Sequence, residues 1–462
     1  MAKPSIPQGT RDFSAETVRK RNYIFSTIRS VFEIYGFEPL ETPAMENLET
    51  LIGKYGEEGD KLMFKILNNG ISNPKNVAKS KAGFEKVLQG KSSSDLTERA
   101  LKYDLTIPFA RFVAMNHGSL TFPYRRYQVQ PVWRGDNPQK GRYREFTQCD
   151  ADVVGSTSLL NEVELASIYH EVFSKLKIDG YELRINSRKI LTALAEVCAE
   201  EGKVVEITTA IDKLDKVGLD RVKEELKQKG LNDDQVEIIE SYLTMDHNKN
   251  IVISNADKLS FLKEFFKDSV SGKQGIKELE FLTRNLTPEV NVIIDLTLAR
   301  GLNYYTGVIF EAKAPSDVKM GSIGGGGRYD DLTGLFGVPN IPGVGISFGV
   351  DRIYDVLTEL NLFPEAVHTG TKVLFLNMGD TESKFAFTRM QELRHNGISC
   401  ELYHESAKIS KQFNYAEKKK IAYAVIIGSK EIEQNYCLVK NLASGAQEVV
   451  IFENLADFFK NN

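Results

Sequence analysis

Three arginines, Arg134, Arg142 and Arg144, lie close together in the segment Trp133–Asp152, around a polar loop between two alternating apolar runs. Two such runs joined by Gly, Pro and Asn residues predict a long β-hairpin. Guanidinium groups are planar, permanently charged and able to form paired hydrogen bonds with phosphate oxygens. The chemistry that they fit is the binding of a polyphosphate that undergoes displacement. The alternative is a solvated charged loop, which is the more common role of an arginine-rich hairpin.

The residues that flank this loop favour a pocket. Arg134 directly follows Trp133, a bulky apolar residue that would lower the local dielectric at the strand end. On the returning strand Gln148, Asp150 and Asp152 alternate, so they share one face of the predicted strand. Amide and carboxylate groups that face arginines describe a polar cavity better than a solvent-facing strand.

Further candidates for chemistry lie in the second half of the chain. Arg300 stands in the apolar run LTLARGLNYYTG, just before Tyr304 and Tyr305. An arginine in such a setting needs an anionic partner, which is either a ligand or a protein carboxylate in a structural ion pair. Tyr329 lies in the run GRYDDL, and Arg352 lies at a predicted strand–helix junction, GISFGVDRI.

Several familiar site patterns are absent from the sequence. There is no phosphate-binding loop of the G-x-x-x-x-G-K-[ST] type, no HExxH and no paired cysteines, so we assign no metal ion with protein ligands. The run SIGGGGRYD allows a close backbone approach to a ligand, but such a run is more often a turn or a bulge.

Composition sets broad limits. Hydrophobic residues make up 42% and charged residues 26% of the 462 residues, which is ordinary for a globular protein of two or three domains. The net charge of -4 gives no indication of a nucleic-acid partner. The apolar stretches are too short to span a membrane, and the N-terminus lacks the apolar core of a signal peptide. Four dispersed cysteines indicate reduced thiols, and hence a cytoplasmic protein.

The first part of the chain predicts an alternation of helices and strands. Periodicity and the positions of Gly and Pro define these elements. They are a helix at Arg19–Tyr35, an extended segment at Phe37–Pro43, strands at Lys61–Leu67 and Ala100–Leu105, an exposed loop at Asn68–Glu98, the hairpin within residues 122–154 and a helix at Glu162–Leu176.

The later part predicts a helical block and a separate C-terminal module. Residues 189–286 are dominated by helical patterns and read as an insertion between two strand-rich regions. Strand character returns at Asn291–Glu311, around a tight turn at Tyr305–Gly307. A boundary is predicted at Asn361–Thr371, and residues 372–462 alternate strand and helix as a compact α/β domain.

Taken together, these segments resemble the class II aminoacyl-tRNA synthetases in their histidyl-tRNA synthetase form. The run WRGDNPQKGRYREFTQCDADVVG, within residues 122–154, resembles motif 2, and LARGLNYYTG resembles the histidine-specific segment. Residues 343–357, with GVGISFGVDRI, are similar to motif 3, and residues 19–43 to motif 1. The resemblance covers essentially the whole chain. It implies an antiparallel-sheet catalytic domain at 1–365 with the helical insertion, an α/β (α+β) class overall, and an anticodon-binding domain at 372–462.

The resemblance implies a role for each arginine at an ATP site. Arg134 would bind the α-phosphate of ATP and the carboxylate of histidine, and Arg300 would approach the α-phosphate from the opposite side; both would be catalytic. Arg142 and Arg144 would lie near the β- and γ-phosphates, and Arg352 would stack on adenine. Mg²⁺ would be bound mainly through the ATP phosphates.

The resemblance also implies a histidine pocket next to the phosphates. Asp104, Thr106 and Gln148 would hold the α-amino end, and Asp152 with Tyr305 would recognise the imidazole. Arg134 and Arg300 would contact histidine as well as ATP. The remaining pocket residues would be Tyr304 and Tyr329, which line it, and Gly325 and Gly326, which leave room for the substrate.

The implied activity is the ATP-dependent activation of L-histidine and its transfer to the 3′ end of tRNA(His), by a cytoplasmic homodimer. One alternative is a synthetase-like regulatory subunit of histidine biosynthesis. Such proteins usually lack the anticodon-binding module and lose part of the arginine set, whereas Arg134, Arg300 and Arg352 are all present here. A protein that only binds RNA is disfavoured by the dense polar pocket residues and the acidic balance.

Overall fold

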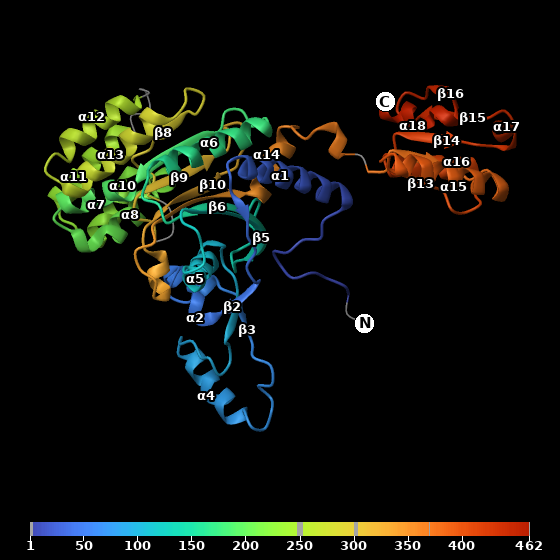
Figure 1. Ribbon diagram of the computed structural model, residues 1–462. Helices are drawn as coiled ribbons and strands as arrows, with labels where there is room; N and C mark the ends of the chain where they lie inside the picture. The colour runs from blue at the N-terminus through green and yellow to red at the C-terminus, as the bar shows by residue number, and fades with distance from the viewer. Residues whose placement is uncertain (1–2, 247–252, 300–303, 369, 462) are drawn as a thin grey trace. The chain divides into compact units, whose positions relative to one another are not determined.

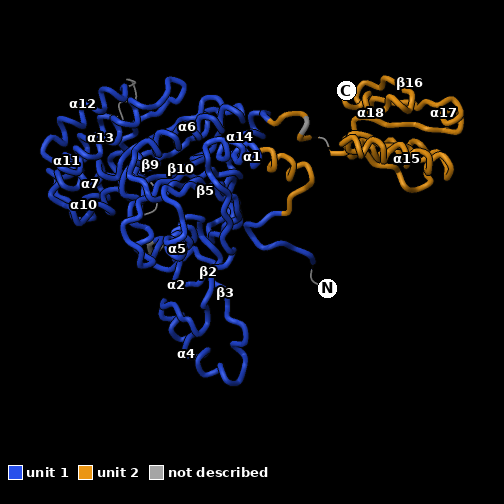
Figure 2. The backbone as a smooth tube through the Cα atoms, viewed as in Figure 1, with its two compact units in different colours: residues 1–11, 24–362 blue, residues 12–23, 363–462 orange. Residues whose placement is uncertain are grey.

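The computed structural model describes residues 3–246, 253–299, 304–368 and 370–461. The chain divides into two compact units, coloured separately in Figure 2. The first consists of residues 1–11 and 24–362, and the second of residues 12–23 and 363–462. Helix α1 (Ala15–Ile34) begins earlier than the sequence predicts and contributes residues to both units.

The first unit is built on an eight-stranded sheet (Figure 1). Neighbouring strands are antiparallel except for the outer pairs β1–β5 and β7–β8, which are parallel. In spatial order the strands are β1 (Glu38–Pro39), β5 (Tyr124–Trp133), β6 (Glu145–Val154), β11 (Gly343–Gly349), β10 (Ser322–Tyr329), β9 (Val308–Lys313), β7 (Glu182–Ser187) and β8 (Val292–Ile294). The predicted hairpin is β5 and β6, and the antiparallel catalytic sheet is confirmed.

Helices α6 (Leu160–Lys175), α13 (Val270–Asn285) and α14 (Val350–Glu359) pack against this sheet, and so does α1, through Phe32. Aromatic rings join α6 to the sheet, since Phe348 of β11 lies 4.8 Å from Tyr169 and 5.7 Å from Phe173 between ring centroids. These rings are fully buried. They fix the middle of the sheet, where β6, β10 and β11 lie side by side.

The glycine run SIGGGG is a strand in the centre of the sheet, with a bulge only between Ser322 and Gly324. The sequence favoured a turn or a bulge. The physical reason for the strand is close packing, because a Cβ on Gly326 would overlap the carbonyl oxygen of Gly345 on the adjacent strand. A Cβ on Gly325 would only come within 3.4 Å of the Phe310 carbonyl oxygen, an ordinary contact distance.

A small three-stranded sheet stands beside the main one, in the order β2 (Met45–Asn47), β4 (Arg99–Leu101) and β3 (Lys65–Ile66). Helices α2 (Leu48–Leu51), α3 (Gly56–Leu62) and α5 (Thr106–Asn116) accompany it. The predicted strand Ala100–Leu105 ends at Leu101, because the carboxylate of Asp104 accepts a hydrogen bond from the amide of Ile107 and starts α5. The predicted strand Lys61–Leu67 is likewise shorter, because α3 continues to Leu62.

The loop predicted at Asn68–Glu98 contains a helix, α4 (Val77–Leu88). The Gly, Ser and Asn residues around it suggested loop structure throughout. Gly83 faces the inside of this segment, where a Cβ would lie 2.8 Å from the hydroxyl of Ser93 and 3.1 Å from Leu96. The segment 68–98 is called the arm below.

The region predicted as helical holds mostly short helices. They are α7 (Arg188–Val197), α8 (Val204–Ile211), α9 (Leu214–Val217), α10 (Leu219–Gln228), α11 (Asp233–Asp246), α12 (Asn255–Phe265) and α13, with a 3₁₀ turn at Glu201–Lys203. Their apolar faces form a buried core that includes Ile207, Leu226, Ile239 and Leu262. Helix α8 contributes Val205 and Thr209 to the site described below.

The second unit contains a five-stranded mixed sheet in the order β13 (Cys400–Leu402), β12 (Val373–Phe375), β14 (Tyr423–Ile426), β15 (Tyr436–Asn441) and β16 (Gln447–Ile451). Its helices after residue 363 are α15 (Asp380–His395), α16 (Ile409–Lys418), α17 (Ser429–Glu433) and α18 (Leu455–Asn461). This is the α/β module that the sequence predicts. Its core includes Phe375, Met390 and Phe459, all nearly inaccessible.

All four cysteines are buried thiols: Cys149 and Cys198 in the first unit, and Cys400 and Cys437 in the second. Burial raises the pKa of Cys400, of Cys198 to about 11 and of Cys437 to about 12.

Candidate active site

Two adjoining cavities lie against the central strands of the main sheet. The larger has a volume of about 650 Å³ and the smaller about 310 Å³. They adjoin because seven residues line both: Arg134, Arg142, Gln148, Ser322, Gly325, Ser347 and Arg352. The β5–β6 hairpin, the strands β10 and β11, and the start of α14 therefore bring together segments that are far apart in the sequence.

Arg134 stands at the junction of the two cavities, directly after β5. Its Nε donates a hydrogen bond to the carbonyl oxygen of Tyr103 at 3.0 Å, and its guanidinium lies 4.4 Å from the centre of the Tyr103 ring. Among the described residues, no carboxylate lies within ion-pair distance of Arg134. Neutral groups thus hold the side chain directly, and its nearest electrostatic partner is the buried Asp104, whose pKa it lowers, so the guanidinium can still pair with an anionic ligand.

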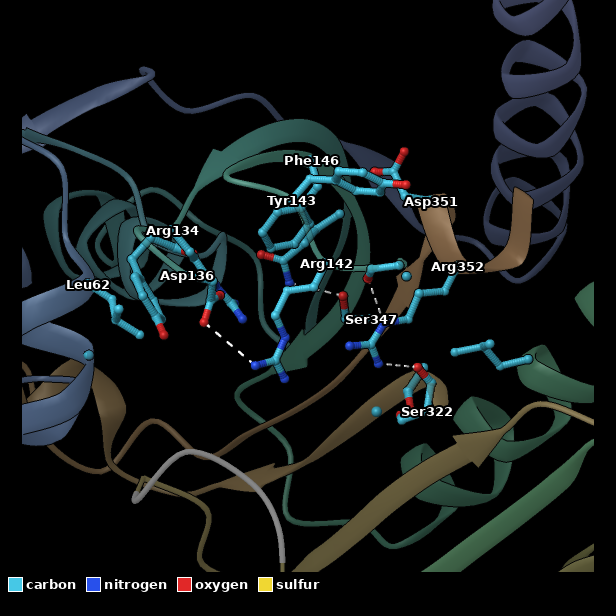
Figure 3. A pocket seen from close by; sticks show the side chains of 18 of the residues that line it. Leu62, Arg134, Asp136, Arg142, Tyr143, Phe146, Ser322, Ser347, Asp351 and Arg352 are labelled. Atoms are coloured by element: carbon cyan, nitrogen blue, oxygen red, sulfur yellow. Dashed lines mark hydrogen bonds and ion pairs between the residues drawn. The ribbon is translucent and has the colours of Figure 1, made fainter. Parts of the chain in front are cut away.

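Arg142 and Arg352 approach the larger cavity from the hairpin loop and from α14, and Figure 3 shows both guanidinium groups directed into the same space. Arg352 is held by backbone carbonyl oxygens, with Nε donating to Gly141 at 3.0 Å and Nη1 to Ser322 at 2.5 Å. Arg142 is about half exposed and makes a long ion pair of 3.8 Å with Asp136. Arg142 can therefore reorient toward a ligand at little cost.

Arg144 departs from the sequence prediction. It lines neither cavity. Its Nε donates to the carbonyl oxygen of Asp136 at 3.2 Å, and its amide donates to the carbonyl oxygen of Gly9 at 2.8 Å. Arg144 lies in the loop before β6, so strand alternation does not fix its side, and these contacts turn it toward Asp136 and the N-terminal segment. In this structure Arg144 supports the loop and does not face the cavity.

The smaller cavity is rich in buried hydrogen-bond acceptors. As predicted, Gln148, Asp150 and Asp152 lie on one face of β6 and line it, and Asp104 joins them from the start of α5. Among the described residues, Asp104 Oδ2, Gln148 Oε1 and Asp150 Oδ1 are buried without a hydrogen-bond partner. Buried polar atoms are nearly always paired, so these acceptors indicate a ligand with several N–H donors.

Asp152 belongs to a buried charge network that the sequence did not reveal. Arg126, which is fully buried, pairs with Asp152 across the β5–β6 hairpin, with 2.8 Å between Nη2 and Oδ2. The hydroxyl of Tyr329 donates to Asp152 Oδ1 at 2.5 Å. Burial raises the pKa of the Asp152 carboxyl, whereas Arg126 acts in the opposite direction. Only the register of the hairpin, which places Arg126 opposite Asp152, could have identified this partner beforehand.

Burial acts on the carboxyl groups of the smaller cavity in the same direction. Burial raises the pKa of Asp150 to about 7, against the effect of Arg126, and it also raises the pKa of Asp104. The carboxylate of Asp104 accepts hydrogen bonds from the Tyr55 hydroxyl at 2.9 Å and from the Ile107 amide at 3.1 Å. Asp104 is therefore fixed in position, with its second oxygen directed away from these donors.

Two comparisons with known proteins decide the family. A family model described as histidyl-tRNA synthetase matches residues 81–353, and a model described as an anticodon binding domain matches residues 372–462. A curated protein named histidine–tRNA ligase, from Christiangramia forsetii, is 50% identical over 463 residues, covering 99% of each chain. The chain belongs to the histidyl-tRNA synthetase family.

Solved structures agree with this assignment. A histidyl-tRNA synthetase from Nostoc sp. PCC 7120 is similar over the full length of both chains, with a TM-score of 0.81 and 33% sequence identity. The resemblance inferred from motifs 1, 2 and 3 and from the C-terminal module is thereby confirmed.

The alternative of a regulatory subunit also has a structural counterpart. A protein from Bacillus halodurans C, described as an ATP phosphoribosyltransferase regulatory subunit/histidyl-tRNA synthetase, covers 92% of this chain with a TM-score of 0.71. Its sequence identity is only 20%, so this likeness concerns the fold alone. The full-length similarity to the histidyl-tRNA synthetases and the anticodon-binding module favour the synthetase.

In this histidyl-tRNA synthetase family member, three tyrosines and a threonine complete the smaller cavity. Thr106, Tyr304, Tyr305 and Tyr329 all line it, as predicted. The rings of Tyr304 and Tyr305 are 4.9 Å apart at their centroids, and Tyr304 meets Tyr329 edge-on at 6.2 Å. The predicted site residue Arg300 lies outside the described residues.

A second buried ion pair supports this tyrosine wall from behind. Arg328 is hydrogen-bonded through Nε and Nη2 to the carboxylate of Glu162, with 2.5 Å and 2.8 Å between the atoms. The backbone of Arg328 in turn accepts a hydrogen bond from the amide of Thr306, and the Thr306 hydroxyl donates to Asp330. This network anchors the turn that follows Tyr305. The sequence analysis missed Glu162, because a lone glutamate near the start of a predicted helix carries no signal of its own.

Proposed function

We propose that this chain activates L-histidine with ATP at the two adjoining cavities and then transfers it to tRNA(His). The ligation of histidine to tRNA is the reaction of the family to which the chain belongs. What we add is the cavity in which each substrate binds: histidine binds in the smaller cavity and ATP in the larger one. We also propose residues 1–365 as the catalytic domain and residues 372–462 as the anticodon-binding domain.

One observation carries this assignment: Arg134 lines both cavities and, among the described residues, is in no ion pair with a carboxylate. A single guanidinium at the junction can contact the carboxylate of an amino acid on one side and a phosphate on the other. The buried acceptors Asp104 Oδ2, Gln148 Oε1 and Asp150 Oδ1 suit the donors of a histidine, which has an ammonium group and ring N–H groups.

In the first step a carboxylate oxygen of histidine attacks the α-phosphorus of ATP. A bond forms between this oxygen and phosphorus, the bond from the α-phosphorus to the bridging oxygen breaks, and pyrophosphate leaves with the electron pair. The protein contributes position and charge stabilisation. Arg134 would neutralise charge on the α-phosphate, and Arg142 would contact the β- and γ-phosphates. Arg352 would cover adenine, and Arg300 would act on the α-phosphate from the opposite side.

In the second step the hydroxyl of the 3′-terminal ribose of tRNA attacks the carbonyl carbon of the adenylate. The ester bond to ribose forms, the bond from carbonyl carbon to the phosphate oxygen breaks, and AMP leaves. The histidine stays in the smaller cavity throughout. Asp104, Thr106 and Gln148 would hold its amino group, and Asp152 would accept a ring N–H while Tyr305 meets the other edge of the ring.

Specificity follows from the same contacts. Arg126 and Tyr329 fix Asp152 in position, and Asp150 Oδ1 on the same strand face is a buried acceptor without a partner among the described residues, which an apolar side chain would leave unsatisfied. A site built to hydrogen-bond its substrate rejects an analogue without that group by several orders of magnitude.

Magnesium would enter with ATP, on the outer phosphates, and would neutralise the charge of the departing pyrophosphate. Among the described residues, no three side chains of the His, Cys, Asp and Glu types gather as a metal cluster. An ion carried by phosphate oxygens needs few protein ligands, so these residues fit this mode of binding.

We further propose a cytoplasmic homodimer. The support for the dimer is the resemblance of residues 19–43 to motif 1, and the support for the cytoplasm is the set of four reduced thiols. In the part of the chain that the structure describes, no helix has the length and apolar character to cross a bilayer. Sedimentation of the purified full-length chain measures the oligomeric state directly.

The test of the proposed function is histidine-dependent exchange of pyrophosphate into ATP, followed by charging of tRNA(His) with labelled histidine. The expected result is exchange that requires histidine, and charging that requires tRNA. Absence of both from well-folded protein would contradict the proposal, and exchange without charging would support the regulatory alternative.

A further inference from the structure

The arm, residues 68–98, is a feature of the first unit that the proposed function does not use. It carries α4 and leaves the small sheet between β3 and β4, and in Figure 1 it extends beyond that sheet. Its hydrogen bonds are almost entirely internal, for example from Asn68 Nδ2 to the carbonyl oxygen of Ser94 and from the Ser80 hydroxyl to the carbonyl oxygen of Ile71. The arm is thus a self-contained element on a narrow base.

The charge of the arm is unusual for this chain. Its five lysines are all exposed, and among the described residues none forms an ion pair with a carboxylate. They are Lys75, Lys79, Lys81, Lys86 and Lys91. In the helical insertion, by contrast, several lysines have acidic partners, as in the pairs of Lys213 with Glu225 and Lys223 with Glu240. Unpaired lysines on one element are available to an external anion.

The arrangement on α4 is suited to an extended anion. Lys79 and Lys86 are seven residues apart, so they lie on the same side of the helix. Lys81 and Phe84 are three residues apart and share another side of it, where Phe84 is 54% exposed. Lysines that contact phosphates beside an exposed aromatic ring that can stack on a base are a combination used for RNA.

The base of the arm lies at the edge of the larger cavity. Leu62, just before β3, lines that cavity, and its carbonyl oxygen accepts a hydrogen bond of 2.7 Å from the amide of Gly135 in the hairpin loop. At the other end, β4 leads directly to Tyr103, which also lines the cavity. The arm therefore begins and ends next to the cavity that the 3′ end of a bound tRNA would enter.

We propose that the arm is a tRNA-binding element, which contacts the phosphodiester backbone of the tRNA through Lys79, Lys81 and Lys86. This inference rests on the proposed function, because it needs a tRNA end in the larger cavity. The arm adds affinity for tRNA and has no part in the activation of histidine, since none of its residues lines either cavity.

The test is a full-length triple variant, Lys79→Gln, Lys81→Gln and Lys86→Gln, assayed for tRNA(His) binding and charging over a range of salt concentrations. Each lost phosphate contact lowers the slope of log K against log [salt] by about 0.7 to 0.9, so the slope should fall by about 2. The value of kcat/KM for tRNA should fall roughly tenfold at about 0.15 M salt. Histidine-dependent pyrophosphate exchange should be unchanged.

The matched control replaces the same three lysines by arginine, which keeps the charge and should keep the salt dependence of the wild type. A neutralised variant with a wild-type slope and wild-type kcat/KM for tRNA would overturn the inference. If Phe84→Ser with Leu88→Ser changes the oligomeric state while the lysine variant charges tRNA normally, the arm is a protein contact and the inference is wrong. Wild-type protein that neither exchanges pyrophosphate nor charges tRNA contradicts the proposed function instead.

Discussion

The two adjoining cavities handle charge in opposite ways. In the larger one, Arg134 is held by the carbonyl oxygen and ring of Tyr103 and Arg352 by the carbonyl oxygens of Gly141 and Ser322, while Arg142 makes only a long ion pair with Asp136. In the smaller one, Asp152 is buried and paired with Arg126, and Asp104 Oδ2 and Asp150 Oδ1 are buried acceptors without a partner among the described residues. The same fold thus presents a cationic surface and a set of buried acceptors within one site.

This difference reflects what each ligand requires. A triphosphate is negatively charged, and a guanidinium already paired with a carboxylate would attract it only weakly. Histidine differs from other amino acids mainly in its ring N–H groups, so recognition depends on acceptors at fixed positions. Desolvated acceptors enforce that choice because leaving one unpaired is costly.

The largest expected effect tests the cationic side. Arg134→Gln removes the charge at the junction of the cavities, and we expect the rate of histidine-dependent pyrophosphate exchange to fall by roughly 10²- to 10³-fold, as for other groups that stabilise developing charge. Arg144→Gln serves for comparison and should reduce the rate far less, because Arg144 supports the hairpin loop from outside the cavities. An equal loss of exchange rate in the two variants would contradict the proposal that Arg134, and not Arg144, contacts the substrates.

The next effect tests the closed network. Arg126→Met leaves Asp152 buried without its cation, and breaking a buried ion pair in this way typically costs about 3–5 kcal/mol of stability. We expect kcat/KM for histidine to fall roughly 100-fold while KM for ATP changes little. The double variant Arg126→Met with Asp152→Asn should regain stability but not histidine specificity. Steady-state exchange kinetics and thermal unfolding measure the two effects separately, and an unchanged preference for histidine would contradict the role of Arg126.

A smaller effect is expected at Gly345, which pairs with Asp152 across strands β11 and β6. A Cβ on Gly345 would overlap the Asp152 carboxylate, so Gly345→Ala should displace that carboxylate at a cost of roughly 1–3 kcal/mol. The KM for histidine should rise accordingly. Gly321→Ala, just before β10, is the control, since its Cβ would meet no atom within 4 Å and Gly321 lines neither cavity. Similar KM values in the two variants would show that Asp152 does not need its present position.

The smallest effect concerns pH. Because burial raises the pKa of Asp150 from 3.8 to about 7, the folded chain retains a proton between these values that the unfolded chain has released. The contribution of Asp150 to the free energy of unfolding therefore falls as pH rises toward 7 and is constant above it. In Asp150→Asn this contribution is absent. Between these pH values the free energy of unfolding of the variant should therefore fall less with rising pH than that of the wild type, by at most about 1.4 kcal/mol per pH unit.

Urea unfolding at several pH values between 5 and 8 measures this difference. The fluorescence of Trp133, the single tryptophan, reports the unfolding of the first unit because it lies in β5. Identical pH dependence in wild type and variant would contradict the raised pKa.

The sequence predicted those parts of the site that depend on local pattern. Alternation alone placed Gln148 and Asp152 on one face of β6, and the turn residues defined the hairpin. The partners that it missed depend on pairing between segments, as with Arg126, which reaches Asp152 only through the hairpin register, and Glu162, which meets Arg328 across 166 positions of sequence. The structure places Arg144 outside both cavities, and the sequence could not show this because spacing within a loop does not determine which side of the hairpin a side chain takes.

The fold followed the same rule. Long periodic helices such as α6 were predicted nearly to their ends, whereas α4 was missed because Gly83 and its polar neighbours resemble a loop until the close packing against Ser93 is known. The central glycine strand β10 was unexpected for a related reason, since only the approach of β11 explains a run of residues without side chains.

Because the cysteines are buried, the rate at which each thiol is alkylated reports how often the structure around it opens. With the pKa values of Cys198, Cys400 and Cys437 raised, thiolate is scarce at neutral pH, so alkylating reagents gain access mainly when the surrounding structure opens. The alkylation rates of Cys149 and Cys198 report the opening of the first unit, and those of Cys400 and Cys437 report the opening of the second. Mass spectrometry of modified peptides can therefore measure the opening of both units in one experiment, with or without histidine and ATP and without an engineered label.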